Sequence, residues 1–454
     1  MEDGRARLTP MKYLLVGGAI FAMHFGGSSM IWPMTWGKES GSSVFLAFIG
    51  IYLTALFFPL LGYLALARSK GTFYTMAGKV SPGFGKAFCS IAMLVLGPLF
   101  CIPRMSAAAW DAFLQVSGFS PESFVAPLIF SIIYYLITYW FIAQKSDAVD
   151  KVSKILFPVL VIAVVAVIGK GIMFPLAVQN PKLYTVNAFA YGFKNGYATA
   201  ELICALVFAT IIIDDLRFKG IAEEHINSNL IKVGIIGITM LTLTHLGHMI
   251  VGSYTGGIFE DLRYSALYSA VVLKLWGTVG GAIFNIALLF AALTTAIGLA
   301  VATANFFQEI TNNRVSYKKS AGITLIISAF VTVLGLSSIV ELAAPLLDIV
   351  YPAGITMTLF YAFIPNLEYR EKVFSSYRVA MVVSFIWGIY EGVLTYLKMF
   401  RINTGILEVV YNKVPLTSMG LGWIPITCTA IVIGLILHRK KRKGIYNYDW
   451  NLKE

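Results

Sequence analysis

Two short stretches of small and polar residues interrupt long apolar segments of this sequence. The first stretch, in apolar residues 11–35, is Gly26-Gly27-Ser28-Ser29. The second stretch, in apolar residues 186–213, is Asn195-Gly196-Tyr197. Glycines let the backbone leave helical geometry at low cost, and serine hydroxyls can replace lost backbone hydrogen bonds. Both stretches are therefore predicted to break a helix in the middle of a membrane.

Such breaks have a specific chemistry. They expose carbonyl and amide groups that hydrocarbon cannot satisfy, so they persist where they line a cavity. A new half-helix N-terminus can meet an anionic group, and freed carbonyls can ligate a cation. A matched pair of breaks in the two halves of a chain is the best pointer to a transporter's binding site. The alternative is a Gly/Ser surface on which helices pack, since small residues are common between membrane helices.

A second group of oxygen atoms lies in apolar residues 278–308. Thr294 and Thr295 offer two adjacent hydroxyls, and the carbonyl of Ala291 lies one turn earlier. Together they could ligate a hard monovalent cation. Alternatively, the hydroxyls bond back to the preceding helical turn, as membrane threonines usually do.

Charged residues inside apolar segments are candidates for function. Arg104 and Asp111 are seven residues apart and so lie on one helix face, and Asp348 follows Glu341 by two turns. Arg104 and Asp348 are predicted at similar depth, which suggests an outer gate formed by this pair. A static structural ion pair is the other interpretation.

Four more ionisable residues have open roles. Lys194, beside the second break, could favour an anionic ligand, pair with Glu201, or face a hydrated vestibule. His245 and His248 are three residues apart without an evident third metal ligand, so packing or proton coupling is expected rather than metal binding. Lys170 could be a snorkelling lysine, or its ammonium could stand in for a sodium ion.

The composition identifies the class of protein that must position these residues. Of the 454 residues, 58% are hydrophobic and only 13% are charged, whereas a soluble domain carries about 25% charged residues. The net charge of +12 does not indicate nucleic-acid binding, because the basic residues lie in alternate loops rather than in one stripe. The chain is predicted to be an all-α polytopic membrane protein.

Twelve segments are long and apolar enough to span a bilayer, which takes about 20 residues. They cover residues 11–35, 42–67, 86–114, 123–143, 153–176, 186–213, 229–251, 278–308, 320–337, 340–364, 376–397 and 419–438. Residues 252–277 are too polar to cross but have helical spacing, so a surface or lid helix is expected there. Most of the 35 Lys and Arg residues fall in loops that lie on the side of the N-terminus, which predicts that both termini are cytoplasmic.

The two broken segments are the first and the sixth. They therefore open two consecutive groups of five spans, over residues 11–176 and 186–364, and two additional spans follow over residues 376–438. An odd number of helices per repeat forces the second repeat into inverted topology. The predicted architecture is one transmembrane domain over residues 1–454.

Several of these motifs resemble the bacterial branched-chain amino-acid carrier family. The resemblance rests on the first span and on Gly97-Pro98-Leu99-Phe100-Cys101-Ile102-Pro103-Arg104, Asn195-Gly196-Tyr197, Leu293–Leu299 and Leu342–Pro352. That family is similar in turn to LeuT-type transporters, whose fold is a 5+5 inverted repeat with discontinuous helices 1 and 6. Its members are sodium-coupled importers of leucine, isoleucine and valine.

The resemblance implies two sites. The sodium ligands would be the backbone of Ala22 and Phe25, the carbonyl of Ala291, and the hydroxyls of Thr294 and Thr295. The amino acid would lie near Phe100 between two stretches, which are Gly26, Gly27, Ser28 and Ser29 on one side and Asn195, Gly196, Tyr197 and Thr199 on the other. The chain departs from the family where Gly26–Ser29 replaces Gly-Ala-Gly-Asn, where Pro33-Met34 replaces Pro-Pro, and at Lys194.

The sequence thus predicts a secondary transporter and not an enzyme, because it contains no nucleophile–base set and no phosphate-binding motif. The expected activity is import of branched-chain amino acids with Na⁺ by alternating access, in a bacterial cell membrane. The expected partners are the amino acid and the lipid bilayer, without nucleic acid or an obligate protein partner. The alternative is a proton-coupled or exchange carrier of another small solute on the same fold, which would use Lys170, Lys194 or a histidine.

Overall fold

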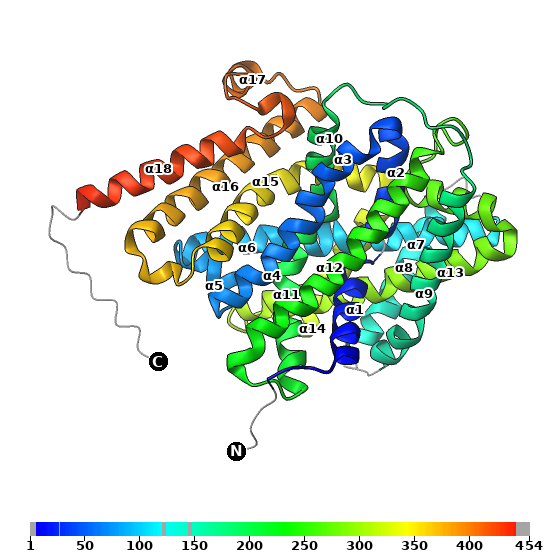
Figure 1. The fold of residues 1–454 in the computed structure, drawn as a ribbon, viewed down its shortest axis with the longest axis horizontal. Helices are drawn as coiled ribbons and strands as arrows, with labels where there is room; N and C mark the ends of the chain where they lie inside the picture. Colours follow the sequence, from blue (N-terminus) through cyan, green and yellow to red (C-terminus); the bar gives the residue numbers. More distant parts are fainter. Residues whose placement is uncertain (1–5, 27, 120–123, 144–147, 442–454) are drawn as a thin grey trace.

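The computed structural model describes residues 6–26, 28–119, 124–143 and 148–441. These residues form helices joined by turns, and no β-strand occurs among them. Figure 1 shows the helices packed side by side in one body. The predicted all-α class is therefore confirmed.

The first half of the chain contains ten α-helices and three irregular helical turns among the described residues. They are α1 (Pro10–His24), α2 (Ser28–Ser40), η1 (Gly41–Ser43), α3 (Val44–Ile51), η2 (Tyr52–Phe57), α4 (Phe58–Ser69), α5 (Phe73–Gly78), α6 (Pro82–Leu94), η3 (Val95–Leu99), α7 (Cys101–Ser117), α8 (Val125–Ala143), α9 (Ala148–Met173) and α10 (Ala188–Asn195). Two of the helices begin with a threonine or serine cap followed by proline, at Thr9-Pro10 and Ser81-Pro82. Such a cap satisfies an amide that the first turn leaves free.

The second half continues this pattern. Its elements are η4 (Gly196–Thr199), α11 (Glu201–Phe218), α12 (Glu223–Ser253), α13 (Tyr264–Ile310), α14 (Tyr317–Thr332), α15 (Leu336–Phe363), η5 (Leu367–Tyr369), α16 (Glu371–Met399), α17 (Gly405–Asn412), η6 (Thr417–Met419) and α18 (Trp423–Lys441). The short helices α5 and α17 were not predicted, because both are too short to give a span pattern.

Seven helical segments of the described residues have the length and composition to cross a membrane, and the bent pair α10–α11 raises the number to eight. Four other predicted spans correspond to α1, α9, α14 and α18, whose described apolar stretches are shorter than 18 residues. The chain is thus a multi-pass membrane protein by these helices alone.

Both predicted break positions interrupt helical structure. In the first, α1 ends at His24, where the amide of Phe25 donates to the carbonyl of Phe21 (2.7 Å), and α2 begins at Ser28. In the second, η4 joins α10 to α11 and the two parts differ in direction by 41°. Ala200 has left-handed backbone angles (φ 60°) that end the η4 turn, so the break does not depend on glycine alone.

The predicted lid helix is the first part of α13. Gly277 (φ 69°, ψ −174°) separates residues 264–276 from the long apolar helix that follows. The preceding loop is held by Lys38 of α2, whose ammonium donates to the carbonyls of Phe259 (2.6 Å), Glu260 (2.6 Å) and Leu262 (2.8 Å).

The helices that carry the breaks pack against other helices of the molecule. Helix α12 packs against α1 and α2, and α13 packs along α7. On one side, α15, α16 and α18 lie next to each other, and α17 covers their end (Figure 1). The two interrupted helices are thereby surrounded by continuous ones, which can satisfy their exposed backbone groups.

Candidate functional site

A buried carboxylate joins the two breaks. Glu201, the first residue of α11, bonds to Nδ1 of His24 at the end of α1 and accepts a hydrogen bond from the hydroxyl of Ser29 in α2. Nε2 of His24 lies 2.9 Å from the hydroxyl of Tyr63 in α4. His24, Ser29 and Glu201 are at most 3% exposed. One side chain of the second break therefore holds both ends of the first.

The local backbone explains the position of Glu201. The Thr199 hydroxyl donates to the carbonyl of Gly196 (3.0 Å) and accepts from the amide of Glu201 (3.3 Å). This hydroxyl closes the η4 turn and caps the start of α11, as a threonine at a helix start can. Glu201 is thereby fixed at the N-terminus of a half-helix, where a negative charge is favoured.

Arg104 of α7 approaches the second break from the other side. Its Nη1 donates to the carbonyl of Ala198 (2.6 Å) and its Nη2 donates to the carbonyl of Thr199 (2.9 Å). The guanidinium lies over the ring of Phe100, 4.2 Å from its centroid, and is only 3% exposed. In the part of the chain that the structure describes, its buried Nε has no hydrogen-bond partner.

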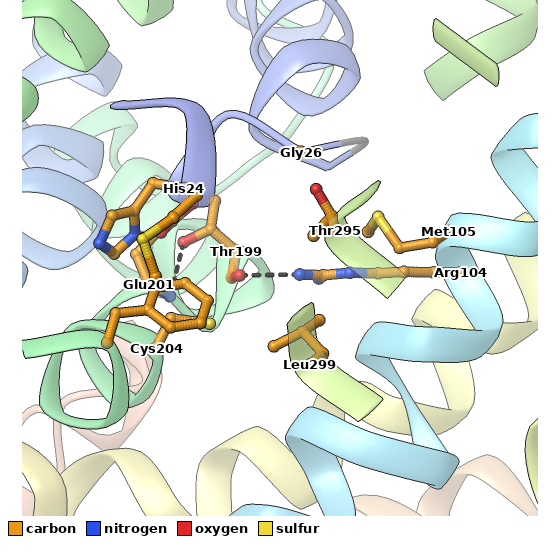
Figure 2. Close-up of a pocket in the computed structure, with 11 residues that line it drawn as sticks. His24, Gly26, Arg104, Met105, Thr199, Glu201, Cys204, Thr295 and Leu299 are labelled. Carbon is orange, nitrogen blue, oxygen red and sulfur yellow. Dashed lines mark hydrogen bonds and ion pairs between the residues drawn. The ribbon is translucent and has the colours of Figure 1, made fainter. Parts of the chain in front are cut away.

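These groups line one small cavity between the breaks. Figure 2 shows His24 and Glu201 on one side of it, Arg104 and Met105 on the other, and Thr199 between them. The complete lining is Met23, His24, Gly26, Arg104, Met105, Thr199, Glu201, Cys204, Phe208, Thr295 and Leu299. Its volume of about 10 Å³ is that of a single water site. The breaks are therefore packed against each other in this conformation.

The predicted substrate residues fall into two groups. Gly26, Ser29 and Thr199 belong to the cavity or its hydrogen-bond network, and Phe100 lies under Arg104. The remaining ones make other contacts: the side-chain amide of Asn195 donates to the carbonyl of Tyr191 in its own helix (2.9 Å), Gly196 faces Thr54, and Tyr197 stacks on Tyr351. Gly27 lies outside the described residues, as does the side chain of Ser28.

The predicted sodium ligands come from α1 and α13. Thr295 lies against the first break, since its hydroxyl would be 1.8 Å from a Cβ added at Gly26. The Thr294 hydroxyl donates to the carbonyl of Ala291 (3.0 Å), which is the bond to the preceding helical turn that the alternative interpretation predicts. On α1, Ala22 is partly buried and Phe25 is buried. The carbonyl and both threonine oxygens still have lone pairs for a cation.

The expected gate pair is replaced by a different cluster. Asp348 of α15 pairs with Lys194 of α10 (2.5 Å), and Lys194 also pairs with Glu391 of α16 (3.1 Å). Arg104 instead binds the carbonyls of the break, so the expectation that it pairs with Asp348 is corrected. Of the three interpretations of Lys194, pairing with Glu201 is wrong, because Lys194 pairs with these two carboxylates and Glu201 with His24. Sequence position gave the depth of these residues but not the direction in which each helix face points.

The other ionisable residues have partners of their own. The ring of His245 bonds to the carbonyl of Leu241 (2.8 Å), and His248 lies 2.5 Å from the hydroxyl of Tyr268. Lys170 lies over the ring of Trp276, 4.3 Å from its centroid. Asp111 accepts from Ser265 of the lid helix. None of these four lines the cavity between the breaks.

Sequence reasoning missed the central His24–Glu201 pair. Glu201 was considered only as a partner of Lys194, and His24 was not considered. The available signal was position: His24 lies two residues before Gly26 of the first break, and Glu201 lies four residues after Tyr197 of the second. An ionisable residue within a span is a functional candidate by default, and two of them next to matched breaks form a stronger one.

Comparison with known proteins identifies the family. The profile of the family described as branched-chain amino acid transport protein matches residues 10–441, which is nearly the whole chain. The chain belongs to the branched-chain amino acid transport protein family. The resemblance of its motifs is thereby confirmed, and this member of the family is a transport protein and not an enzyme.

Curated relatives of this branched-chain amino acid transport protein agree in length. It is 28% identical over 431 residues to the branched-chain amino acid permease BraB of Bacillus subtilis (strain 168), covering 93% of this chain and 95% of the relative. It is 29% identical over 445 residues to a putative branched-chain amino acid carrier protein of Staphylococcus aureus (strain USA300). The match covers 93% of this chain and 96% of the relative.

Solved structures show the fold of this family member. The inward-facing conformation of Mhp1 matches with a TM-score of 0.58 at 12% identity, covering 98% of this chain and 96% of Mhp1. MhsT in complex with L-phenylalanine matches with a TM-score of 0.51 at 16% identity, covering 94% of this chain and 98% of MhsT. Both neighbours are LeuT-fold transporters, so the all-helical fold of this chain is similar to the LeuT fold.

Proposed function

We propose that this protein imports branched-chain amino acids together with Na⁺ by alternating access. The observation that carries the proposal is the junction of the two breaks, where Glu201 binds both His24 and Ser29 beside a cavity. A site between two interrupted helices can be exposed to either side when the helix pieces move apart. The family match supports the substrate class, because the relatives are named as branched-chain amino acid permeases or carriers.

The proposal includes a specific topology. The chain would cross the membrane twelve times, with α1–α2 and α10–α11 as the discontinuous helices 1 and 6. Two inverted five-helix repeats would cover residues 11–176 and 186–364, followed by two helices over residues 376–438. Both termini would be cytoplasmic, in agreement with the positions of the basic loops. The bacterial relatives support a bacterial cell membrane as its location.

Sodium is proposed as the coupling ion on the basis of oxygen atoms near the first break. The carbonyl of Ala291, the hydroxyls of Thr294 and Thr295, and backbone oxygens of Ala22 and Phe25 would bind it. Thr295 contacts the break at Gly26, and unwound carbonyls with nearby hydroxyls are typical sodium ligands in such transporters.

The test is leucine uptake into proteoliposomes with and without an inward sodium gradient. We expect uptake to require Na⁺, and expect Thr294→Val and Thr295→Val each to raise the Na⁺ concentration for half-maximal uptake about tenfold, since a lost oxygen ligand costs roughly 1–2 kcal/mol. Thr429→Val is the matched control, because Thr429 also bonds back within its helix but lies exposed on α18. Uptake that ignores Na⁺ and follows a pH gradient would contradict sodium coupling.

The second candidate is a proton-coupled carrier on the same fold. It is favoured by one observation: two titratable side chains, His24 and Glu201, are in buried contact at the junction of the breaks. Protonation of either group would weaken or change the link between the breaks, which is what a coupling proton must do. Uptake driven by an inward proton gradient, without Na⁺ and lost in Glu201→Gln, would support this candidate.

A further inference from the structure

The cavity between the breaks presents opposite charges on opposite sides. Arg104 enters it from α7 and Glu201 from α11, with the Thr199 region between them (Figure 2). Most of the remaining lining is apolar and consists of Met23, Met105, Cys204, Phe208 and Leu299. A cation, an anion and an apolar surface are the three features that complement a free aliphatic amino acid, which carries a carboxylate, an ammonium group and an apolar side chain.

Arg104 has donor capacity that the protein does not use. Two of its nitrogens donate to the carbonyls of Ala198 and Thr199, but these are neutral acceptors and leave the guanidinium charge unbalanced. Its Nε is buried and lacks a partner among the described residues. A buried donor without an acceptor costs about 1–3 kcal/mol, and more when it is charged. A carboxylate bound at this guanidinium would supply both the acceptor and the counter-charge.

Glu201 has the complementary capacity. A neutral His24 with its proton on Nδ1 donates to Glu201 and accepts from the hydroxyl of Tyr63, so both ring nitrogens are satisfied. In this arrangement the hydrogen bonds to the carboxylate come only from uncharged groups, His24 and Ser29. Each carboxylate oxygen has a further lone pair. An ammonium group bound there would balance the charge.

We propose that Arg104 and Glu201 form a zwitterion-binding pair, in which Arg104 binds the substrate's α-carboxylate and Glu201 binds its α-ammonium. This inference rests on the proposed function and adds the residues that recognise the backbone of the amino acid. It assigns the carboxylate to a side chain of α7 rather than to the half-helix N-terminus of the first break. The apolar lining then receives the aliphatic side chain, while the opening of the cavity needed for entry comes from the breaks.

The test uses three ligands and the purified full-length protein in nanodiscs. L-leucine has both charged groups, L-leucinamide lacks the carboxylate, and 4-methylpentanoate lacks the ammonium group. For the wild-type protein we expect each truncated ligand to bind about 100-fold more weakly than leucine, as measured by competition with radiolabelled leucine in the presence of Na⁺. Equal binding of all three ligands would overturn the zwitterion-binding pair.

The variants separate charge recognition from a structural role. Arg104→Gln is expected to weaken leucine binding about 100-fold while leucinamide binding, followed by thermal stabilisation, changes less than threefold. Glu201→Gln is expected to weaken leucine binding by a similar factor and to leave the binding of 4-methylpentanoate unchanged. If each variant weakens the binding of all three ligands by the same factor, the two residues only position the breaks and the inference is wrong.

Two further variants serve as controls for the substitutions of Arg104 and Glu201. Arg378→Gln removes another arginine that donates to a backbone carbonyl, at Lys79 (2.9 Å) and away from the cavity, and leucine affinity should not change. Arg104→Lys retains the charge if Arg104→Gln does not fold, and should still prefer leucine to leucinamide. Loss of that preference would overturn the role of Arg104. A wild-type protein that binds no branched-chain amino acid would refute the proposed function itself, which is a different outcome.

Discussion

At the scale of residues, this membrane protein keeps its buried charges in two separate clusters. One is the junction of His24, Ser29 and Glu201, and the other contains Lys194, Asp348 and Glu391. The second cluster also receives the hydroxyl of Tyr411 from α17, which donates to Glu391 (3.2 Å). It therefore ties α10 to α15, α16 and the helix that covers them.

Lys194→Met tests the importance of this second cluster. The substitution leaves two carboxylates facing each other without a cation, and both are at most 6% exposed. Because the Lys194 side chain is itself 32% exposed, we expect a loss of about 1–3 kcal/mol of stability rather than the full cost of a buried charge. Thermal unfolding of the purified protein measures this loss.

Lys79→Met is the matched control, because its pair with Glu368 is much more accessible (side chains 47% and 35% exposed) and should contribute less than about 1 kcal/mol. Adding Asp348→Asn to Lys194→Met should recover part of the stability by removing one of the two like charges. If Lys194→Met is as harmless as the control, the cluster does not hold α10 in place.

At the scale of elements, the segment predicted as a surface or lid helix, residues 264–276, is attached by one glycine and one lysine. Gly277 turns the chain between residues 264–276 and the rest of α13, with backbone angles that are available almost only to glycine. Lys38 binds three carbonyls of the loop before the lid. The loop before residues 264–276 is thus bound to α2, and Gly277 changes the chain direction at the end of this segment.

Gly277→Ala should destabilise the protein by about 1–3 kcal/mol, because alanine is strained at φ 69° and ψ −174°. The control is Gly322→Ala in α14, where an added Cβ would meet nothing within 4 Å among the described residues. That change should be neutral or stabilise by up to about 1 kcal/mol through helix propensity. Melting temperatures that move in the same direction for both variants would contradict the role of Gly277 as a joint.

At the scale of the whole molecule, glycines let helices that are far apart in the sequence approach closely. A Cβ at Gly192 of α10 would lie 1.9 Å from the carbonyl oxygen of Ala47 in α3. A Cβ at Gly50 of α3 would lie 2.2 Å from the carbonyl oxygen of Phe189 in α10. Small residues on both helices thus form a tight contact between the second predicted span and the sixth.

Gly192→Val should prevent this contact, because the clash is with backbone and neither helix can yield without moving. We expect little folded protein, measured as the monodisperse fraction in size-exclusion chromatography after detergent extraction. Gly83→Val is the control, since a Cβ at Gly83 would meet nothing within 4 Å in the described part of the chain. Normal yields of Gly192→Val would show that the helices have room to separate.

The sequence alone determined the class of protein and the membership in the family, and it predicted two breaks at stretches where the structure interrupts its helices. These properties follow from local composition: apolar length predicts spans, and glycine with serine or asparagine marks where a helix is interrupted. The helix before the eighth predicted span and its end at Gly277 were also predictable, because polarity and helical spacing change at that point.

Only the tertiary structure decided which charges meet. Arg104 was expected to pair with Asp348, and Glu201 was one of the partners considered for Lys194. The structure instead pairs Lys194 with Asp348 and Glu391, and brings Glu201 to His24. The physical reason is that position along a span gives a residue's depth, whereas its neighbours depend on how each helix is rotated and on which helices pack beside it. Residues 177 positions apart in the chain, His24 and Glu201, meet only because two interrupted helices cross at their breaks.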